Sequence, residues 1–202
     1  VGVRCGCFGA EATPAQSPPY PRHLAEIQGR PFVLDVWGRL GERDQNAIGV
    51  IGSRRTTHYG TESAKKLSYQ LAYAGLTVVS GLARGIDTAA HQGAIAAKGR
   101  TSAVIGSGLM KLYPPENAAL AEKISQGNGS IVSESSMEIE PDRQTFPMRN
   151  PIISGGSHGN RVLQAGLTSR PLSTPAQAPG PARSVCALPA PVTPPVDPRS
   201  HP

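Results

Sequence analysis

The sequence predicts an α/β fold in which a doubly wound, mainly parallel sheet lies between two layers of helices. Four short apolar segments have the composition of buried strands. They are residues 47–51, 76–79, 101–105 and 130–133. Helical segments alternate with them at residues 61–74, 87–97 and 115–126. Strands that alternate with helices at this spacing pair in parallel, and right-handed crossovers place helices on both faces, which gives three layers, α/β/α.

Each helix is predicted from its own local pattern. In the first, Ala64, Leu67, Leu71 and Ala74 recur at intervals of three or four residues and give one apolar face. Gly75 follows as a suitable terminating residue. Gly99 ends the second helix and Pro115 begins the third.

The ends of the chain are predicted to be irregular tails. Residues 1–30 contain several prolines and read as an irregular lead-in, with one or two helical turns near residues 23–28. Residues 31–157 form the expected domain, which starts with a strand at residues 31–38. Trp37 in that strand could stack on a base, but we expect it to pack against the sheet. Residues 158–202 are rich in proline, and an ordered and a disordered remainder of the domain both stay open.

Composition excludes some classes of protein and permits others. The 202 residues carry a net charge of +6, which fits a polyanionic partner without requiring one. The 3 cysteines are too few for a disulfide framework, and Cys5-Gly-Cys7 has no nearby partners for a metal, so no metal site is expected. No apolar run approaches the roughly 20 residues that span a bilayer. We therefore expect a cytoplasmic protein that does not contact membranes.

Four loops are expected to meet at one edge of the sheet, where the parallel strands end and ligands bind in such folds. They are residues 52–55, 80–85, 106–111 and 133–134, and three of them combine glycine with a basic side chain. In residues 80–87, two glycines flank Arg84 at the start of a helix, an arrangement that suits a phosphate. A tight turn with a solvated arginine is the alternative for this stretch.

The same loops lack the residues that common catalytic sites need. Gly106-Ser107-Gly108 is only half of a dinucleotide fingerprint, and neither a Walker lysine motif nor a Gly-x-Ser-x-Gly run is present. His91 could act as a general base, although capping or packing is the favoured role, and Asp87 suits the start of a helix. We therefore expect no catalytic residues and no cofactor.

A further segment, residues 145–150, contains Phe146 held extended before Pro147. Beside Arg143 and Arg149, an exposed Phe146 would form a base-stacking platform with phosphate clamps. Alternatively, Phe146 fills the core and Arg149 binds a carbonyl group. The sequence favours neither interpretation.

Together these motifs resemble the DNA-processing protein A family (DprA, also called Smf) over about residues 31–157. The resemblance is carried by Gly-Ser-Arg-Arg-Thr-Thr-x-Tyr-Gly at 52–60, Ser-Gly-Leu-Ala-Arg-Gly-Ile-Asp-x-x-Ala-His at 80–91, Gly-x-Gly-Leu-x-x-x-Tyr-Pro at 106–114, Ser133-Glu134, and Phe-Pro-x-Arg-Asn-x-Ile-Ile-Ser-Gly at 146–155. Five motifs in order at consistent spacing are highly specific.

The resemblance implies a Rossmann-like domain, usually dimeric, that binds single-stranded DNA. It implies protection of incoming strands during natural transformation and their delivery to the RecA recombinase, without catalysis. By the resemblance, Arg54 and Arg84 are the main phosphate contacts, and Phe146 stands at the position where an aromatic side chain would meet a base. The full set implied is Gly52, Ser53, Arg54, Arg55, Ser80, Gly81, Arg84, Gly85, Lys111, Arg143, Phe146, Arg149 and Asn150.

The chain departs from the family pattern near its end. Pro151 stands where relatives usually continue Arg-Asn-Arg, which removes one cation and one N–H donor. Prolines also fall where a later helix is expected, so the far edge of the sheet and the homodimer are open at this point. Two other functions remain as alternatives. One is an enzyme for nucleotides or nucleoside phosphates with His91 or Glu134 as the acid or base, and the other is an inactive remnant of the family.

Overall fold

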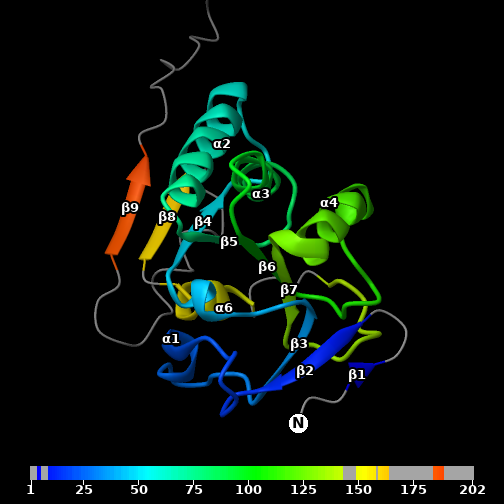
Figure 1. The fold of residues 1–202 in the computed structure, drawn as a ribbon. Helices are drawn as coiled ribbons and strands as arrows, with labels where there is room; N and C mark the ends of the chain where they lie inside the picture. Colours follow the sequence, from blue (N-terminus) through cyan, green and yellow to red (C-terminus); the bar gives the residue numbers. More distant parts are fainter. Residues whose placement is uncertain (1–3, 6–8, 143–148, 158, 164–183, 189–202) are drawn as a thin grey trace, which may run out of the picture.

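A parallel sheet forms the centre of the molecule in the computed structural model (Figure 1). The structure describes residues 4–5, 9–142, 149–157, 159–163 and 184–188. Four strands at the centre pair in parallel in the order β7-β6-β5-β4. These strands are β4 (Ala47–Gly52), β5 (Thr77–Ser80), β6 (Thr101–Ile105) and β7 (Gly129–Ser133). The predicted α/β class and all four predicted strands are confirmed.

Helices cover both faces of this sheet, as the connections predict (Figure 1). One face is covered by α2 (His58–Tyr73), α3 (Ile86–Ala96) and α4 (Ala118–Lys123). The other is covered by α1 (Arg22–Ala25) and α6 (Asn150–Gly155). The third predicted helix is divided, because the short 3-10 turn η2 (Pro115–Asn117) precedes α4 and the π-type turn η3 (Ile124–Asn128) follows it. No helix within the described ranges combines the length and apolar character needed to cross a bilayer.

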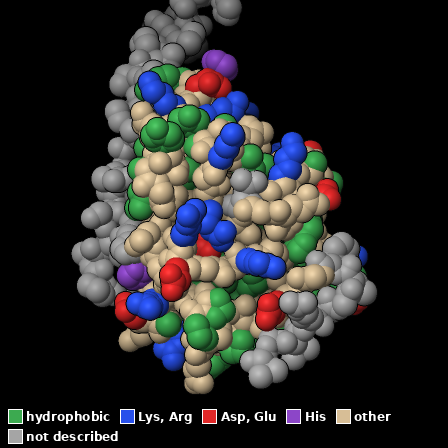
Figure 2. Space-filling view, viewed as in Figure 1, with side chains coloured by type: hydrophobic (Ala, Val, Ile, Leu, Met, Phe, Trp, Pro, Cys, Tyr) green, Lys and Arg blue, Asp and Glu red, His purple; other side chains and the backbone are tan. Residues whose placement is uncertain are grey.

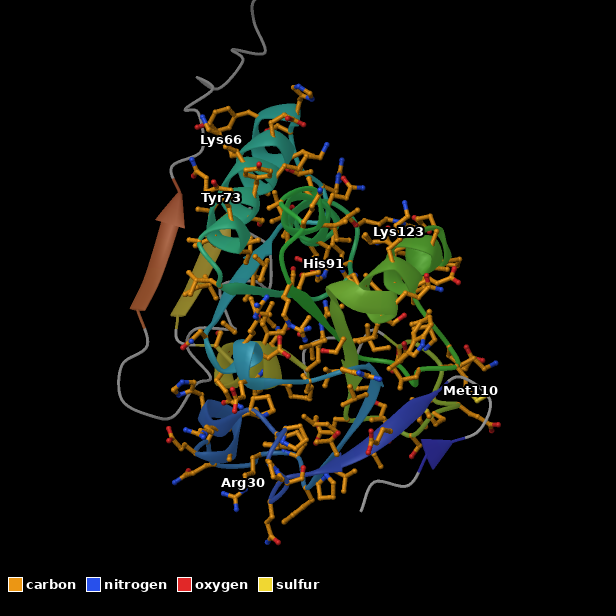
Figure 3. All side chains as sticks on the ribbon, in the orientation of Figure 1. Arg30, Lys66, Tyr73, His91, Met110 and Lys123 are labelled. Atoms are coloured by element: carbon orange, nitrogen blue, oxygen red, sulfur yellow. The ribbon has the colours of Figure 1, made fainter. Side chains whose placement is uncertain are left out.

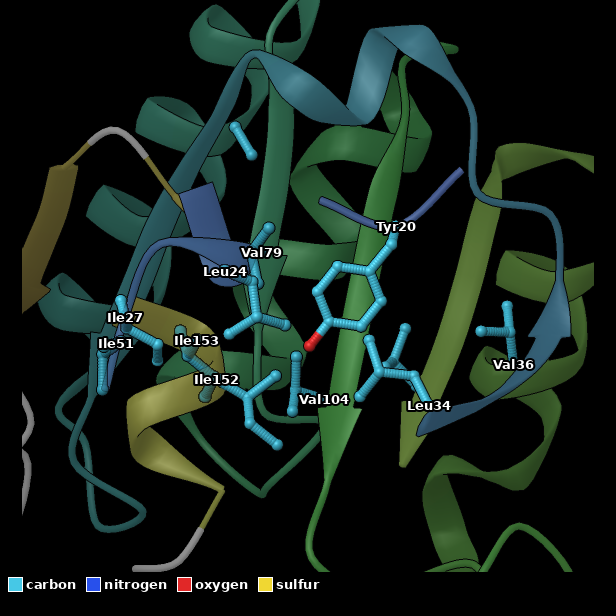
Figure 4. Close-up of a cluster of buried hydrophobic side chains, with 12 residues drawn as sticks. Tyr20, Leu24, Ile27, Leu34, Val36, Ile51, Val79, Val104, Ile152 and Ile153 are labelled. Carbon is cyan, nitrogen blue, oxygen red and sulfur yellow. The ribbon is translucent and has the colours of Figure 1, made fainter. Parts of the chain in front are cut away.

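The sheet has an apolar core on each face, and successive residues of a strand contribute to opposite cores because neighbouring side chains in a strand point to opposite faces. Val78 packs with Ala64 and Ile86 under α2 and α3. Val79, the next residue, packs on the other face with Leu24 and Ile153 from α1 and α6 (Figure 4). The apolar strands are therefore buried on both sides, which is why their sequence does not alternate.

The N-terminal segment is more regular than its prolines indicated, and the expectation of an irregular lead-in over residues 1–30 is wrong in this respect. Strand β2 (Ala10–Pro14) pairs antiparallel with β3 (Val33–Gly38), and β1 (Arg4–Cys5) pairs with β2. Strand β3 in turn pairs antiparallel with β7. Proline is tolerated in β2 because Pro14 is its last residue.

Buried side chains from this segment complete the core on the face covered by α1 and α6. Tyr20, Leu24 and Ile27 are buried in the same apolar cluster as Leu34 (Figure 4). The Tyr20 hydroxyl donates to the carbonyl of Pro31 at 2.8 Å. Trp37 in β3 is partly buried against the core beneath α4, as expected for a packing residue. Residues 10–38 are therefore part of the fold.

Two described strands extend the other edge of the sheet. Strand β8 (Gly159–Leu163) pairs in parallel with β4, and β9 (Ser184–Leu188) pairs in parallel with β8. The sheet thus reads β1-β2-β3-β7-β6-β5-β4-β8-β9. The described sheet thus continues past residue 157, where an irregular tail was expected. The rest of residues 158–202 lies outside the described residues, so where the domain ends stays a prediction.

A buried carboxylate joins several elements at the edge where the parallel strands begin. Asp44, in the 3-10 turn η1 (Glu42–Gln45), is only 4% exposed. It accepts hydrogen bonds from Arg100 at 2.7 and 3.1 Å, from the Thr77 hydroxyl at 3.1 Å and from the Gly41 amide at 2.8 Å. Because both oxygens are occupied, the charge is compensated despite its burial.

We expect Asp44→Asn to lower the free energy of unfolding by about 2–3 kcal/mol, because the Arg100 guanidinium loses its counter-charge. Urea denaturation at neutral pH measures this change. Glu42→Gln, an exposed change in the same turn, is the control and should stay within about 0.5 kcal/mol of the starting protein. Equal losses in the two variants would contradict the role given to Asp44.

Candidate nucleic-acid interface

Two of the four predicted loops lie against each other where β4 and β5 end. We call residues 52–57 the Arg54 loop and residues 80–87 the Arg84 loop. The amide of Ile86 donates to the carbonyl of Ser53 at 3.3 Å, so the start of α3 is hydrogen-bonded to the Arg54 loop. The structure therefore brings these two predicted segments together at the expected edge of the sheet.

Hydrogen bonds within the Arg54 loop give it a defined shape. The Ser53 hydroxyl accepts from the amide of Arg55 at 3.1 Å and donates to the carbonyl of Arg55 at 2.7 Å. Thr57 then caps α2, accepting from the amide of Gly60 at 3.2 Å. Arg54 and Arg55 lie between these two turns with exposed side chains, a position from which cations can meet an anion.

Gly85 satisfies two constraints in the Arg84 loop. Its φ is +81°, in the left-handed region, and a Cβ there would lie 2.5 Å from the carbonyl oxygen of Ser53. Any other residue would meet both the backbone strain and the contact with the neighbouring loop. The close approach of the two loops therefore depends on glycine at this position.

We expect Gly85→Ala to lower the free energy of unfolding by more than Gly75→Ala does. Gly75 has a similar φ of +87° but no atom within 4 Å of its built Cβ, so its substitution tests backbone strain alone. Strain costs about 1–3 kcal/mol at either position, and overpacking adds about 1–3 kcal/mol at Gly85. Urea denaturation of both variants measures the difference. Losses of the same size would contradict the packing of the two loops.

Arg84 projects from its loop to the surface, and 58% of its side chain is exposed. Its Nε forms an ion pair with Glu116, and its guanidinium carbon lies 5.9 Å from the centre of the Tyr113 ring. The hydrogen bond from Arg84 lowers the pKa of the Glu116 carboxyl from its ordinary value. Arg84 is thus held between a carboxylate and an aromatic ring at the edge of the loop.

The third predicted loop is packed by the chain itself. The amide of Gly108 donates to the carbonyl of Ile139 at 2.9 Å, and the amide of Met110 donates to the carbonyl of Met137 at 2.9 Å. Lys111 at the end of this loop pairs with Glu140 at 2.7 Å. These backbone donors are therefore already used, and Gly108 permits the close contact, since a Cβ there would overlap the Met137 backbone.

Arg149 is buried, with only 8% of its side chain exposed. Its Nη1 donates to the carbonyls of Gly81 and Val104. Its Nη2 lies 3.7 Å from the carboxylate of Asp87. Burial lowers the pKa of Arg149 and raises that of Asp87, and the attraction between them opposes both shifts. This geometry matches the interpretation in which Arg149 binds carbonyl groups.

The other predicted residues of this segment are only partly placed. Arg143 and Phe146 lie outside the described residues, so their predicted contacts stay predictions. Asn150 is half-buried as the first residue of α6, and Pro151 follows it in the first turn. Proline is tolerated there because the first amides of a helix have no partner within it. The departure at Pro151 therefore does not break α6.

Positive charge alone does not locate an interface on this molecule. Figure 2 shows Lys and Arg side chains at several separate places on one face, some of them beside acidic side chains. The Arg54 and Arg84 loops stand out because exposed arginines and closely packed glycine backbone occur together there.

His91, the histidine of the enzyme alternative, lies inside the protein (Figure 3). The Thr101 hydroxyl donates to the carbonyl of Val78 at 2.7 Å, so His91 Nδ1, 2.7 Å from that hydroxyl, is assigned as the donor to it. Burial, with a smaller contribution from Arg149, lowers the pKa of His91 from 6.5 to about 3. A buried neutral imidazole cannot reach a bound ligand.

The described part of the chain likewise offers no cluster of three or more His, Cys, Asp or Glu side chains for a metal ion. Glu134, the other residue of the enzyme alternative, lies at the surface after β7, and partial desolvation of its carboxyl raises its pKa.

We expect His91 to make the protein less stable as pH falls below about 6.5. The folded pKa of about 3 lies below the unfolded value of 6.5, so only the unfolded chain binds the proton between these values. Between these pH values, the free energy of unfolding therefore falls by about 1.4 kcal/mol for each unit by which pH is lowered. Urea denaturation from pH 7 to pH 5 measures the free energies of unfolding of the starting protein and of His91→Leu. The free energy of the starting protein should fall relative to that of the variant as pH falls. A constant difference would contradict a buried neutral His91.

Asn117 is a site residue that sequence reasoning missed. Its side-chain amide donates to the carbonyl of Leu82 at 2.8 Å and to the Thr88 hydroxyl at 2.9 Å. It therefore holds the Arg84 loop from the turn before α4. Glu116 and Tyr113, which contact Arg84, were also missed. The sequence signals were the place of Tyr113 in the motif at 106–114 and of Glu116 just after it, but the contacts themselves join segments distant in sequence.

Comparison with known proteins identifies the family of this fold and site. The model of the DNA recombination-mediator protein A family matches residues 12–199. The chain belongs to this family. Protein Smf of Synechocystis is 42% identical over 176 residues, which cover 85% of the chain and 44% of that relative. The chain thus spans less than half the length of this relative.

Solved structures of the family share the fold. DprA of Streptococcus pneumoniae superposes with a TM-score of 0.84 at 35% identity, covering 94% of this chain and 65% of that one. DprA of Helicobacter pylori, described as having a unique single-stranded DNA binding mode, superposes with a TM-score of 0.81 at 25% identity. That match covers 92% of this chain and 83% of the other. The Rossmann-like fold and the family resemblance expected from the motifs are confirmed.

Proposed function

We propose that this chain binds single-stranded DNA through the Arg54 and Arg84 loops. The observation that carries the proposal is that two glycine-containing loops, packed together at the carboxyl ends of parallel strands, each present exposed arginine. Arginine suits phosphate because its planar donors bind two oxygens at once. Family membership supports a DNA strand as the anion, since one solved relative is described by its single-stranded DNA binding mode.

Arg54, Arg55 and Arg84 are the proposed phosphate contacts. Ser53 and Gly85 shape the backbone that presents them, as the contacts between the two loops indicate. Phosphates repeat along a strand whatever its sequence, so contacts of this kind favour binding with little sequence preference. Phe146 remains the proposed base-stacking residue.

The wider role follows from the family rather than from the loops. We propose that the protein takes part in natural transformation and recombination, protects incoming single strands and delivers them to the RecA recombinase. We also propose a homodimer and a cytoplasmic location, and we assign no catalytic step or cofactor. Family membership is the support for these assignments.

Titration of a fluorescently labelled oligothymidylate with the protein tests the proposal. Arg84→Glu should weaken binding by about 10- to 100-fold at low salt, because a phosphate contact is replaced by repulsion. Arg39→Glu is the matched control. Arg39 is exposed just after β3, and its amide donates to the carbonyl of Gly129 at the start of β7, so it lies at the opposite edge of the parallel strands.

The control should bind within about twofold of the starting protein, and all binding should weaken as salt rises. Equal affinities for Arg84→Glu and Arg39→Glu would reject the two loops as the DNA site. Failure of the starting protein to bind the oligonucleotide would reject the proposed function itself.

A further inference from the structure

The Arg149 guanidinium contacts the Arg84 loop at both ends. At the start of the loop it donates to the carbonyl of Gly81, and at the end it lies 3.7 Å from the carboxylate of Asp87. A third contact, to the carbonyl of Val104, attaches the same group to the end of β6. One side chain from the residue before α6 therefore fixes the loop relative to the sheet.

These contacts determine which way the peptide between Gly81 and Leu82 faces. In a trans peptide the carbonyl oxygen and the following N–H point in opposite directions. Because Arg149 holds the Gly81 carbonyl, the Leu82 amide points away from the guanidinium.

Leu82 itself adopts a backbone conformation that needs outside support. Its φ is +57°, which is rare for a residue with a branched side chain, and its side chain is fully buried. Such conformations persist only where neighbouring contacts fix them. Here Arg149 holds the carbonyl before Leu82, and Asn117 donates to the Leu82 carbonyl at 2.8 Å.

Gly81 is matched to this arrangement. A Cβ at residue 81 would overlap the Arg149 guanidinium. The absence of a side chain at residue 81 therefore lets the guanidinium reach the carbonyl. Burial of the group also keeps it from meeting a strand directly, in contrast to the exposed Arg84.

We propose that Arg149 is a positioning residue for DNA binding. It holds the Arg84 loop in the conformation that presents the Arg84 side chain to a phosphate, and it does not touch the strand. The inference rests on the proposed function, in which the Arg84 loop binds single-stranded DNA.

A double-mutant cycle separates positioning from direct contact. Arg149→Met should weaken binding of labelled oligothymidylate by about tenfold when Arg84 is present, and by less than about twofold in the Arg84→Ala background. If Arg149 acts only by positioning Arg84, its substitution has little further effect on binding once Arg84 has been replaced by alanine. Arg39→Met is the matched control for lost charge and should change binding by less than about twofold in both backgrounds.

Equal losses in the two backgrounds would show that Arg149 meets the strand independently, and no loss in either would show that it does not position the loop. Each of these results overturns the proposal. If Arg149→Met does not melt cooperatively, Arg149→Lys, which keeps the charge and one donor, replaces it under the same criteria. Gly81→Ala provides a second perturbation and should weaken binding in the same direction, because its Cβ displaces the guanidinium.

Backbone amide chemical shifts of the free protein test positioning without DNA. Arg149→Lys should move the amide signals of Leu82, Ala83 and Arg84, and Arg39→Lys should leave them unchanged. Unmoved loop signals overturn the proposal even where binding changes. If the starting protein does not bind DNA but these signals move, the proposed function fails while the control of loop conformation by Arg149 is supported.

Discussion

The buried pair of Arg149 and Asp87 is the contact on which the arrangement of the candidate site depends. Removing a guanidinium and a carboxylate from water is costly, and the cost is offset only if their hydrogen-bonding groups find partners. Here the Arg149 guanidinium donates to two backbone carbonyls at strand ends, Gly81 and Val104, and the Asp87 carboxylate lies 3.7 Å from it. Satisfying the buried charge therefore requires β5, β6 and the start of α3 to adopt one relative position, and that position defines the edge at which Arg84 emerges.

Two glycines of the same motif serve this arrangement for different physical reasons. Gly85 is required by its left-handed backbone and by the carbonyl of Ser53 beside it. Gly81 has no such backbone constraint and is required by the space that the Arg149 guanidinium fills. Gly85 thus lets two loops pack together, whereas Gly81 makes room for the Arg149 side chain, which comes from the residue before α6.

Local pattern was sufficient to predict the sheet, because buried strands and amphipathic helices leave signatures in neighbouring residues. The prolines of the N-terminal segment concealed β2, whose pairing with β3 is a non-local contact. The direction of the Arg149 side chain could not be predicted either, since Asp87 and Gly81 lie far from it in sequence. The sequence likewise does not show that the loop at residues 106–111 is packed against residues 137–139, which leaves the Arg54 and Arg84 loops as the proposed site.

The ion pair between Arg84 and Glu116 has a consequence for the way any anion would bind. A phosphate that binds Nε of Arg84 displaces a carboxylate that is attached to the protein and cannot diffuse away. Binding at this arginine is then an exchange of one anion for another, and it releases fewer small ions than an unpaired arginine would. The salt dependence of binding would accordingly count fewer charges than the number of arginines in contact with the strand.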